Sequence, residues 1–147
     1  MDETVALVRY ISEHIAAYYD EERQILRVKY VGVMTPAVTS EFYHWLGSVA
    51  KSNPDKVLTA RGSIYDFRDV TEFANSNISS TARQSEQVNQ QLDLQNHPVA
   101  IIAKDAIQTA TLTVTMRVNG QQDRKRIVKS ETDALAFIND FHARSAE

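Results

Sequence analysis

The sequence contains no cysteine among its 147 residues. This absence excludes disulfide bonds, thiolate nucleophiles, iron–sulfur clusters and zinc sites built on cysteine. Glycine is scarce as well, with four residues, and the chain has no G-x-G-x-x-G loop, no Walker lysine loop and no G-x-S-x-G elbow. Because these loops cradle phosphates or present a catalytic serine, their absence removes the common one-domain catalytic designs. We predict no cofactor.

The histidines offer no metal-binding pattern. The chain has four of them, and none stands in an HExxH motif or in close HxH spacing: His14, His44, His97 and His142. We therefore predict no metal site and interpret each histidine as a surface residue or as one whose ring is already hydrogen-bonded.

The chain also lacks a strong charge of either sign and any long apolar run. Its formal net charge of −3 favours solubility over attraction of nucleic acid to the whole surface. The one dense basic cluster, Arg124-Lys125-Arg126 with Lys129, has no interleaved aromatic residue, so we interpret it as a solvated strand edge. No run approaches the roughly 20 apolar residues that span a bilayer, and Met1 to Ser12 shows no signal-peptide pattern. We expect a cytoplasmic protein with no nucleic-acid or membrane partner.

The length and composition are those of one ordinary folded domain. With 43% hydrophobic and 24% charged residues, the sequence is far from the composition of disordered chains. We predict a single domain over residues 1–147, with residues 1–12 as a peripheral N-terminal extension. Val5, Val8 and Ile11 in that segment fit a short helix or an extended stretch equally well.

The first half of the chain predicts a hairpin, a helix and a strand. Ile15 to Tyr19 and Gln24 to Val31 are apolar, β-branched runs separated by three acidic residues, which indicates two strands and a tight turn. Thr35-Pro36 is a helix start signal, and an apolar stripe follows it up to Asn53-Pro54. Lys56 to Phe67 reads as a central strand that ends at Asp66.

The second half predicts further helices and strands, with one ambiguous segment. The residues Ile78, Ala82, Val88 and Leu92 mark the face of a helix that ends before Pro98, and Val99 to Ala103 is a strand covered on both faces. Asp105 to Gly120 alternates as a strand would, yet a helix fits nearly as well. Arg126 to Val128 is a short strand. Ser130, with Asp133 three residues later, resembles a capping box that opens the last helix.

These elements predict an α/β fold. We expect a mixed sheet of about five strands, with an antiparallel first hairpin, parallel right-handed crossovers and helices packed on the sheet.

Three short motifs carry a resemblance to a known family. They are Ile64-Tyr65-Asp66-Phe67-Arg68-Asp69, Val99-Ala100-Ile101-Ile102-Ala103, and Arg126-Ile127-Val128-Lys129-Ser130 followed by Ala134-Leu135-Ala136-Phe137-Ile138. Together with the element order they resemble the bacterial SpoIIAA-like family of STAS-fold proteins over about residues 12 to 145. The resemblance implies a helix over Asp105 to Gly120. It also implies a binding or regulatory module that acts on a protein partner or a small apolar or anionic ligand, and it is compatible with a homodimer.

The regulatory phosphoserine of that fold has no counterpart here. In the phosphorylated antagonists a serine follows an aspartate at the end of the central strand. Asp66 matches the aspartate, but Phe67 and Arg68 stand where the serine would be. Thr71 is the nearest hydroxyl and is a weak candidate phosphosite, displaced by several residues.

The candidate ligand-binding residues are Asp66, Arg68, Asp69 and Trp45. The three charged residues lie where a strand is predicted to end, which is where open α/β sheets place ligands. Arg68 could bind an anionic or carbonyl group, or the cluster could be a structural ion pair. Trp45, with Phe42 and Met116, could line an apolar pocket or pack in the core.

We interpret the sequence as that of a non-catalytic binding or regulatory module. The alternative is a small hydrolase or isomerase that uses Asp66 or Asp69 as a base and Arg68 as an anion clamp. An enclosed pocket around a strongly perturbed carboxylate would favour that alternative.

Overall fold

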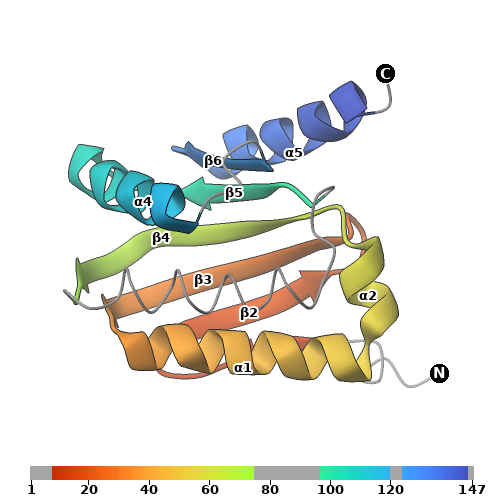
Figure 1. The fold of residues 1–147 in the computed structure, drawn as a ribbon, viewed down its shortest axis with the longest axis horizontal. Coiled ribbons are helices and arrows are strands. Elements are labelled where there is room, and N and C mark those ends of the chain that lie inside the picture. Colours follow the sequence, from red (N-terminus) through yellow and green to blue (C-terminus); the bar gives the residue numbers. More distant parts are fainter. Residues whose placement is uncertain (1–7, 75–96, 120–123, 146–147) are drawn as a thin grey trace.

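The structure, a computed structural model, describes residues 8–74, 97–119 and 124–145. The described residues form a six-stranded sheet whose strands lie in chain order, with helices on both faces (Figure 1). The strands are β1 (Arg9–Ile11), β2 (Ile15–Asp20), β3 (Ile25–Met34), β4 (Gly62–Phe73), β5 (Val99–Ile102) and β6 (Lys125–Val128). The helices are α1 (Pro36–Ser52), α2 (Pro54–Thr59), α4 (Ala106–Asn119) and α5 (Glu131–Ser145).

The sheet is mixed, as predicted. β1, β2 and β3 are antiparallel, and β4, β5 and β6 follow in parallel. The predicted hairpin is β2 and β3. The strand beyond the expected five is β1, because residues 9–11, which the sequence assigned to a peripheral extension, pair with β2 along the edge of the sheet. The predicted helix around Ile78 to Leu92 lies outside the described residues.

The two faces of the sheet have separate cores. On the inner face, which α1 and α4 cover, Tyr30 of β3 stacks on Phe67 of β4 at 4.9 Å, and Phe42 of α1 packs against Tyr30. On the outer face, α5 packs its apolar side onto β3, β4 and β5. That second core consists of Ile25, Ile64, Ala100, Ile102, Ala134, Phe137 and Ile138. All four residues of β5 are buried, as the uninterrupted apolar run predicted.

Both predicted helix starts are confirmed at the level of hydrogen bonds. The Thr35 hydroxyl accepts from the Val38 N–H at 3.2 Å, and α1 ends at Ser52, immediately before Asn53-Pro54. The Ser130 hydroxyl accepts from the Asp133 N–H at 3.1 Å at the start of α5. In both cases a hydroxyl satisfies an N–H that has no partner within the helix.

The central strand was predicted wrongly at both ends. Residues 54–59 form the helix α2, because Pro54 in the first turn starts a new helix directly after α1. β4 begins at Gly62, where an added Cβ would lie 2.8 Å from the Pro98 carbonyl oxygen, so the close approach of these two backbone segments requires glycine. It then continues to Phe73 instead of ending at Asp66.

β4 reaches Phe73 by way of two β-bulges. Its register against β3 shifts by one residue between Lys29 and Val31, and by one more between Gly32 and Val33. At each bulge two consecutive residues of β4 are exposed, Arg68 with Asp69 and Thr71 with Glu72, while Phe67 and Val70 stay buried.

The ambiguous segment at 105–120 forms the helix α4, as the family resemblance implied and against the local alternation. The Asp105 carboxylate accepts from the Gln108 N–H at 2.8 Å and caps its first turn. Thr109, Thr111 and Thr113 each donate a hydroxyl hydrogen bond to the carbonyl four residues earlier, at 2.9, 3.1 and 2.7 Å. The threonine hydroxyls, which gave the segment its strand-like alternation of polar and apolar residues, therefore find their acceptors within the helix.

Gln108 completes the hydrogen bonding of β4 beyond the end of β5. β5 ends at Ile102, opposite Asp66, so beyond this point the carbonyls of β4 that face away from β3 have no strand to pair with. The buried amide of Gln108 donates to the Phe67 and Val70 carbonyls at 2.6 and 3.2 Å, and its oxygen accepts from the Lys104 N–H at 2.9 Å.

We expect Gln108→Ala to lower the free energy of unfolding by about 1 to 3 kcal/mol, because it removes the Gln108 donor to the Phe67 carbonyl and the acceptor of the Lys104 N–H, while the Val70 carbonyl keeps its bond from Lys104 Nζ. Urea unfolding measures the change. Ile107→Ala is the matched control, since the neighbouring Ile107 is 80% exposed, and surface changes shift stability by about 0.5 kcal/mol or less. Equal stability of the two variants would contradict this role.

Candidate functional site

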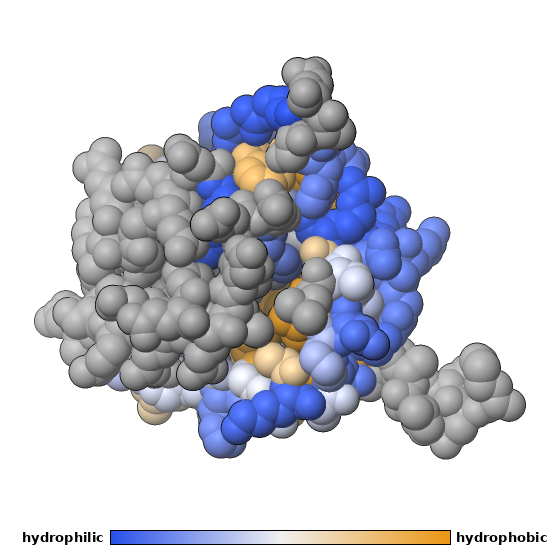
Figure 2. Space-filling model, turned by 45° about the vertical axis from the view of Figure 1, so that its right-hand side comes forward, coloured by the Kyte–Doolittle hydropathy of each residue, from blue (hydrophilic) through white to orange (hydrophobic). Residues whose placement is uncertain are grey.

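Half of the outer face of the sheet carries no helix among the described residues. α5 packs on β4, β5, β6 and Ile25 at the start of β3, and the part formed by β1, β2, the rest of β3 and the far end of β4 is exposed. Figure 2 shows another side of the molecule, where hydrophilic residues surround small apolar areas. We call the uncovered half the open face. It consists of Arg9, Ile11, Ala16, Tyr18, Arg27, Lys29, Val31, Val33, Asp66, Arg68, Asp69 and Glu72.

Exposed apolar side chains gather on the open face. In the described part of the chain five large hydrophobic residues are exposed, and four of them lie here: Ile11, Tyr18, Val31 and Val33. Ile11 is 65% exposed and Tyr18 is 49% exposed. They point outward because side chains alternate along a strand, and their neighbours Tyr10, Ala17 and Tyr30 occupy the inner face.

Asp66 and Arg68 form a bidentate ion pair on the open face. The Arg68 Nε and Nη2 donate to the two Asp66 carboxylate oxygens at 3.0 and 2.8 Å. The Arg68 backbone N–H, which lies at the first bulge, adds a third bond to Oδ1 at 3.0 Å. Partial burial favours the neutral acid, but these hydrogen bonds and the charge of Arg68 outweigh it and hold the pKa of Asp66 below its usual value.

Three further ion pairs involve residues of β3. Lys29 Nζ contacts Asp69 Oδ2 at 2.8 Å, and this hydrogen bond raises the pKa of Lys29. Arg27 Nε donates to Asp20 Oδ2 at 3.2 Å, and its Nη1 contacts Glu131 at the start of α5. Arg27 therefore connects the hairpin to the helix that covers the other half of this face.

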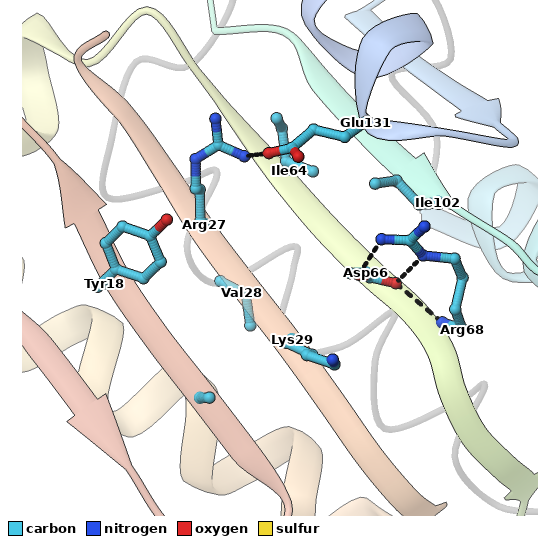
Figure 3. A pocket seen from close by; sticks show the side chains of 10 residues that line it. Tyr18, Arg27, Val28, Lys29, Ile64, Asp66, Arg68, Ile102 and Glu131 are labelled. Carbon is cyan, nitrogen blue, oxygen red and sulfur yellow. Dashed lines mark hydrogen bonds and ion pairs between the residues drawn. The ribbon is translucent and has the colours of Figure 1, made fainter. Parts of the chain in front are cut away.

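A shallow depression lies between these pairs and the start of α5 (Figure 3). Its volume is about 150 Å³, and Ala16, Ile64 and Ile102 are among the residues that line it. Charged side chains stand around it, with the dashed contacts of Figure 3 joining Arg27 to Glu131 and Arg68 to Asp66. Small-molecule sites are usually about 300 to 1,000 Å³, so this depression has room for a single side chain.

The structure brings together three of the four predicted site residues. Asp66, Arg68 and Asp69 share the open face, but in the middle of β4 and not at its end. Trp45 lies on α1 at the inner face, with its ring 5.9 Å from Tyr10 and 6.1 Å from Phe42, so the sheet separates it from the charged residues. Thr71 is exposed at the second bulge, five residues along β4 from Asp66.

The arrangement offers little to general acid–base chemistry. Asp66 accepts three hydrogen bonds from Arg68, and a carboxylate whose pKa is lowered is a weak base. Arg68 uses the same donors that an anionic substrate would need. Within residues 8–74, 97–119 and 124–145, no group of three or more potential metal ligands lies close together, and no helix is long and apolar enough to cross a membrane.

Sequence reasoning missed the other residues of the open face. Ile11 and Tyr18 were part of apolar segments, and Arg27 and Lys29 were part of a predicted strand. The alternation of Arg27 and Lys29 with Leu26, Val28 and Tyr30 was the available signal, because it indicates a strand with one polar face.

His97 is partly buried and hydrogen-bonded, in line with its interpretation as a satisfied histidine. Its Nε2 lies 2.7 Å from the Ser63 hydroxyl, and its ring also bonds the backbone of Ala60. Burial, together with the nearby charge of Arg124, lowers the pKa of His97 to about 4.

Several solved structures have the same fold. An anti-sigma factor antagonist from Mycobacterium paratuberculosis is 11% identical, with a TM-score of 0.55, and the match covers 95% of this chain and all of that one (100%). The unphosphorylated anti-sigma factor antagonist SpoIIAA is 7% identical, with a TM-score of 0.50 and coverage of 90% and 97%. The murine anion transporter Slc26a9 is 16% identical, with a TM-score of 0.56. That match covers 91% of this chain and 22% of the transporter.

The chain therefore has a SpoIIAA-like fold, as the sequence motifs predicted. No protein-family model and no curated protein matches the sequence. At identities this low the comparison defines the fold and not the activity.

We expect Arg68→Met to raise the pKa of Asp66, because the variant keeps the aliphatic stem but removes the charge and the side-chain donors. It should cost about 0.5 to 1 kcal/mol of stability at neutral pH, a small value because Arg68 is 46% exposed. The cost should disappear at low pH, since the pair stabilises only while Asp66 is ionised and is lost as the pH falls through its lowered pKa. NMR titration and unfolding measure both effects, with Lys51→Met as control. An unchanged pKa of Asp66 would contradict the pairing.

We also expect stability to fall between pH 6.5 and pH 4 because of His97. Its pKa of about 4 in the folded protein is below the unfolded value of 6.5, so over this range the unfolded chain binds more protons. The loss should reach about 3 kcal/mol at pH 4. His97→Gln should flatten the pH dependence measured by urea unfolding, and His44→Gln, at an exposed position of α1, should retain it. An equally steep profile in His97→Gln would refute this assignment.

Proposed function

We propose that this protein is a non-catalytic regulatory module that binds a partner protein through its open face. The observation that carries the proposal is the gathering of four exposed apolar residues, among them Ile11 and Tyr18, beside ion pairs on a sheet face without a described covering helix. Contiguous apolar surface with a polar surround marks interaction sites on soluble proteins.

The dimensions of the site favour a protein over a small ligand. The depression of about 150 Å³ is smaller than the usual small-molecule pocket but suits one apolar side chain of a partner. Protein interfaces commonly combine a flat surface with a few buried anchor side chains. An aromatic residue such as Tyr18 often contributes much of the binding energy at such a surface.

The chemistry of the site favours binding over catalysis. The Asp66 carboxylate is engaged by Arg68, and Asp69 is engaged by Lys29. The similarly folded antagonists are named for their action on an anti-sigma factor, which is an effect on another protein. That analogy of fold supports a regulatory role here without identifying the partner.

The proposal is tested with three forms of the full chain as bait: wild type, Tyr18→Asp and the control Ile107→Asp. Ile107 is an exposed apolar residue of α4, so its change alters charge and hydrophobicity equally but away from the open face. A protein that binds the purified wild type should bind Ile107→Asp equally and Tyr18→Asp at least about tenfold more weakly, a difference of 1.4 kcal/mol. Hydrogen exchange should show protection of β2 and β3 in the complex.

Circular dichroism and thermal unfolding establish that all three baits are folded. Partner binding that is unaffected by Tyr18→Asp, or protection that maps away from β2 and β3, would show that the open face is not the interface. Turnover of a substrate that depends on Asp66 would overturn the non-catalytic role.

A further inference from the structure

We propose that the protein that occupies the open face is a second copy of this chain, related by a two-fold axis that places one open face against the other. The inference rests on the proposed function, because it names the partner for the same surface. It follows from three features of that face: its charge balance, its exposed isoleucine beside a side-chain-sized depression, and its area.

The ion-paired charges of the open face compensate one another within the face. Arg68 pairs with Asp66, Lys29 with Asp69, and Arg27 with two carboxylates. A strongly acidic or basic partner would therefore gain little attraction. An identical face presents alternating charges of both signs, and a two-fold axis can place a positive group of one copy opposite a negative group of the other.

Ile11 supplies the apolar contact. It is the most exposed large hydrophobic residue of the open face, at 65%, and it stands on the edge strand β1. The depression of about 150 Å³ on the same face, with Ala16, Ile64 and Ile102 in its lining, has the size of one aliphatic side chain. In a two-fold dimer, Ile11 of each copy enters the depression of the other copy. The same symmetry therefore buries both exposed isoleucines and fills both depressions.

The area of the face predicts a weak dimer. Strands lie about 4.8 Å apart and rise about 3.3 Å per residue, so this four-strand surface covers on the order of 500 Å². A standard interface buries about 800 Å² per partner, and smaller ones belong to transient complexes. We therefore expect a dissociation constant in the micromolar range, which leaves monomer and dimer in exchange as the concentration changes.

Sedimentation velocity of the full chain over a concentration series tests the proposal. The wild type should change from monomer to dimer in the micromolar range. Ile11→Asp should raise the dissociation constant at least about tenfold, and the matched control Ile107→Asp should leave it unchanged, since Ile107 is also exposed but stands on α4. Circular dichroism and thermal unfolding verify that both variants are folded.

The second copy is rejected as the occupant if the wild type stays monomeric at hundreds of micromolar, or if Ile11→Asp and Ile107→Asp change the association equally. A monomeric chain that binds a different protein, in a manner sensitive to Tyr18→Asp, overturns this inference and leaves the proposed function standing. If that binding is also insensitive to Tyr18→Asp, both fail.

Discussion

The length of β4 is the constraint on which the rest of the structure depends. β4 continues for seven residues past Asp66, the position where its neighbour β5 ends, and backbone groups in a buried strand must find hydrogen-bond partners. Gln108 of α4 supplies those partners to the Phe67 and Val70 carbonyls. The same stretch contains the two bulges, so one segment decides both where α4 docks and which charged side chains face outward.

The uneven covering of the sheet follows from this topology. A six-stranded sheet is wider than one helix, and on the outer face α5 covers β4, β5, β6 and only the start of β3. The antiparallel strands at the other end bury one face and expose the other, as such strands commonly do. Arg27 stands at the boundary, joined to Asp20 on β2 and to Glu131 on α5, so the covered and open halves are held in a fixed relation.

Local signals in the sequence predicted the elements whose stability is local. Thr35-Pro36 and Ser130 marked helix starts because a cap acts within a few residues, and the alternation of β3 marked its buried side. The helix α4 was different: its threonines alternate like a strand, and its first turn is fixed by the contact of Gln108 with β4. The bulges and the separation of Trp45 from Asp66 by the sheet depend on register, which no short motif encodes.

The ion pairs that stabilise the open face also make it easier for a partner protein to cover that face. An unpaired Arg68 or Asp66 would attract charged ligands strongly, but it would also make the face costly to desolvate against a protein. Paired within the face, the two side chains can be covered by a partner that brings no compensating charge of its own. The pairing that lowers the pKa of Asp66 and makes it a weak base thus also makes the surface around Tyr18 and Ile11 compatible with a neutral protein interface.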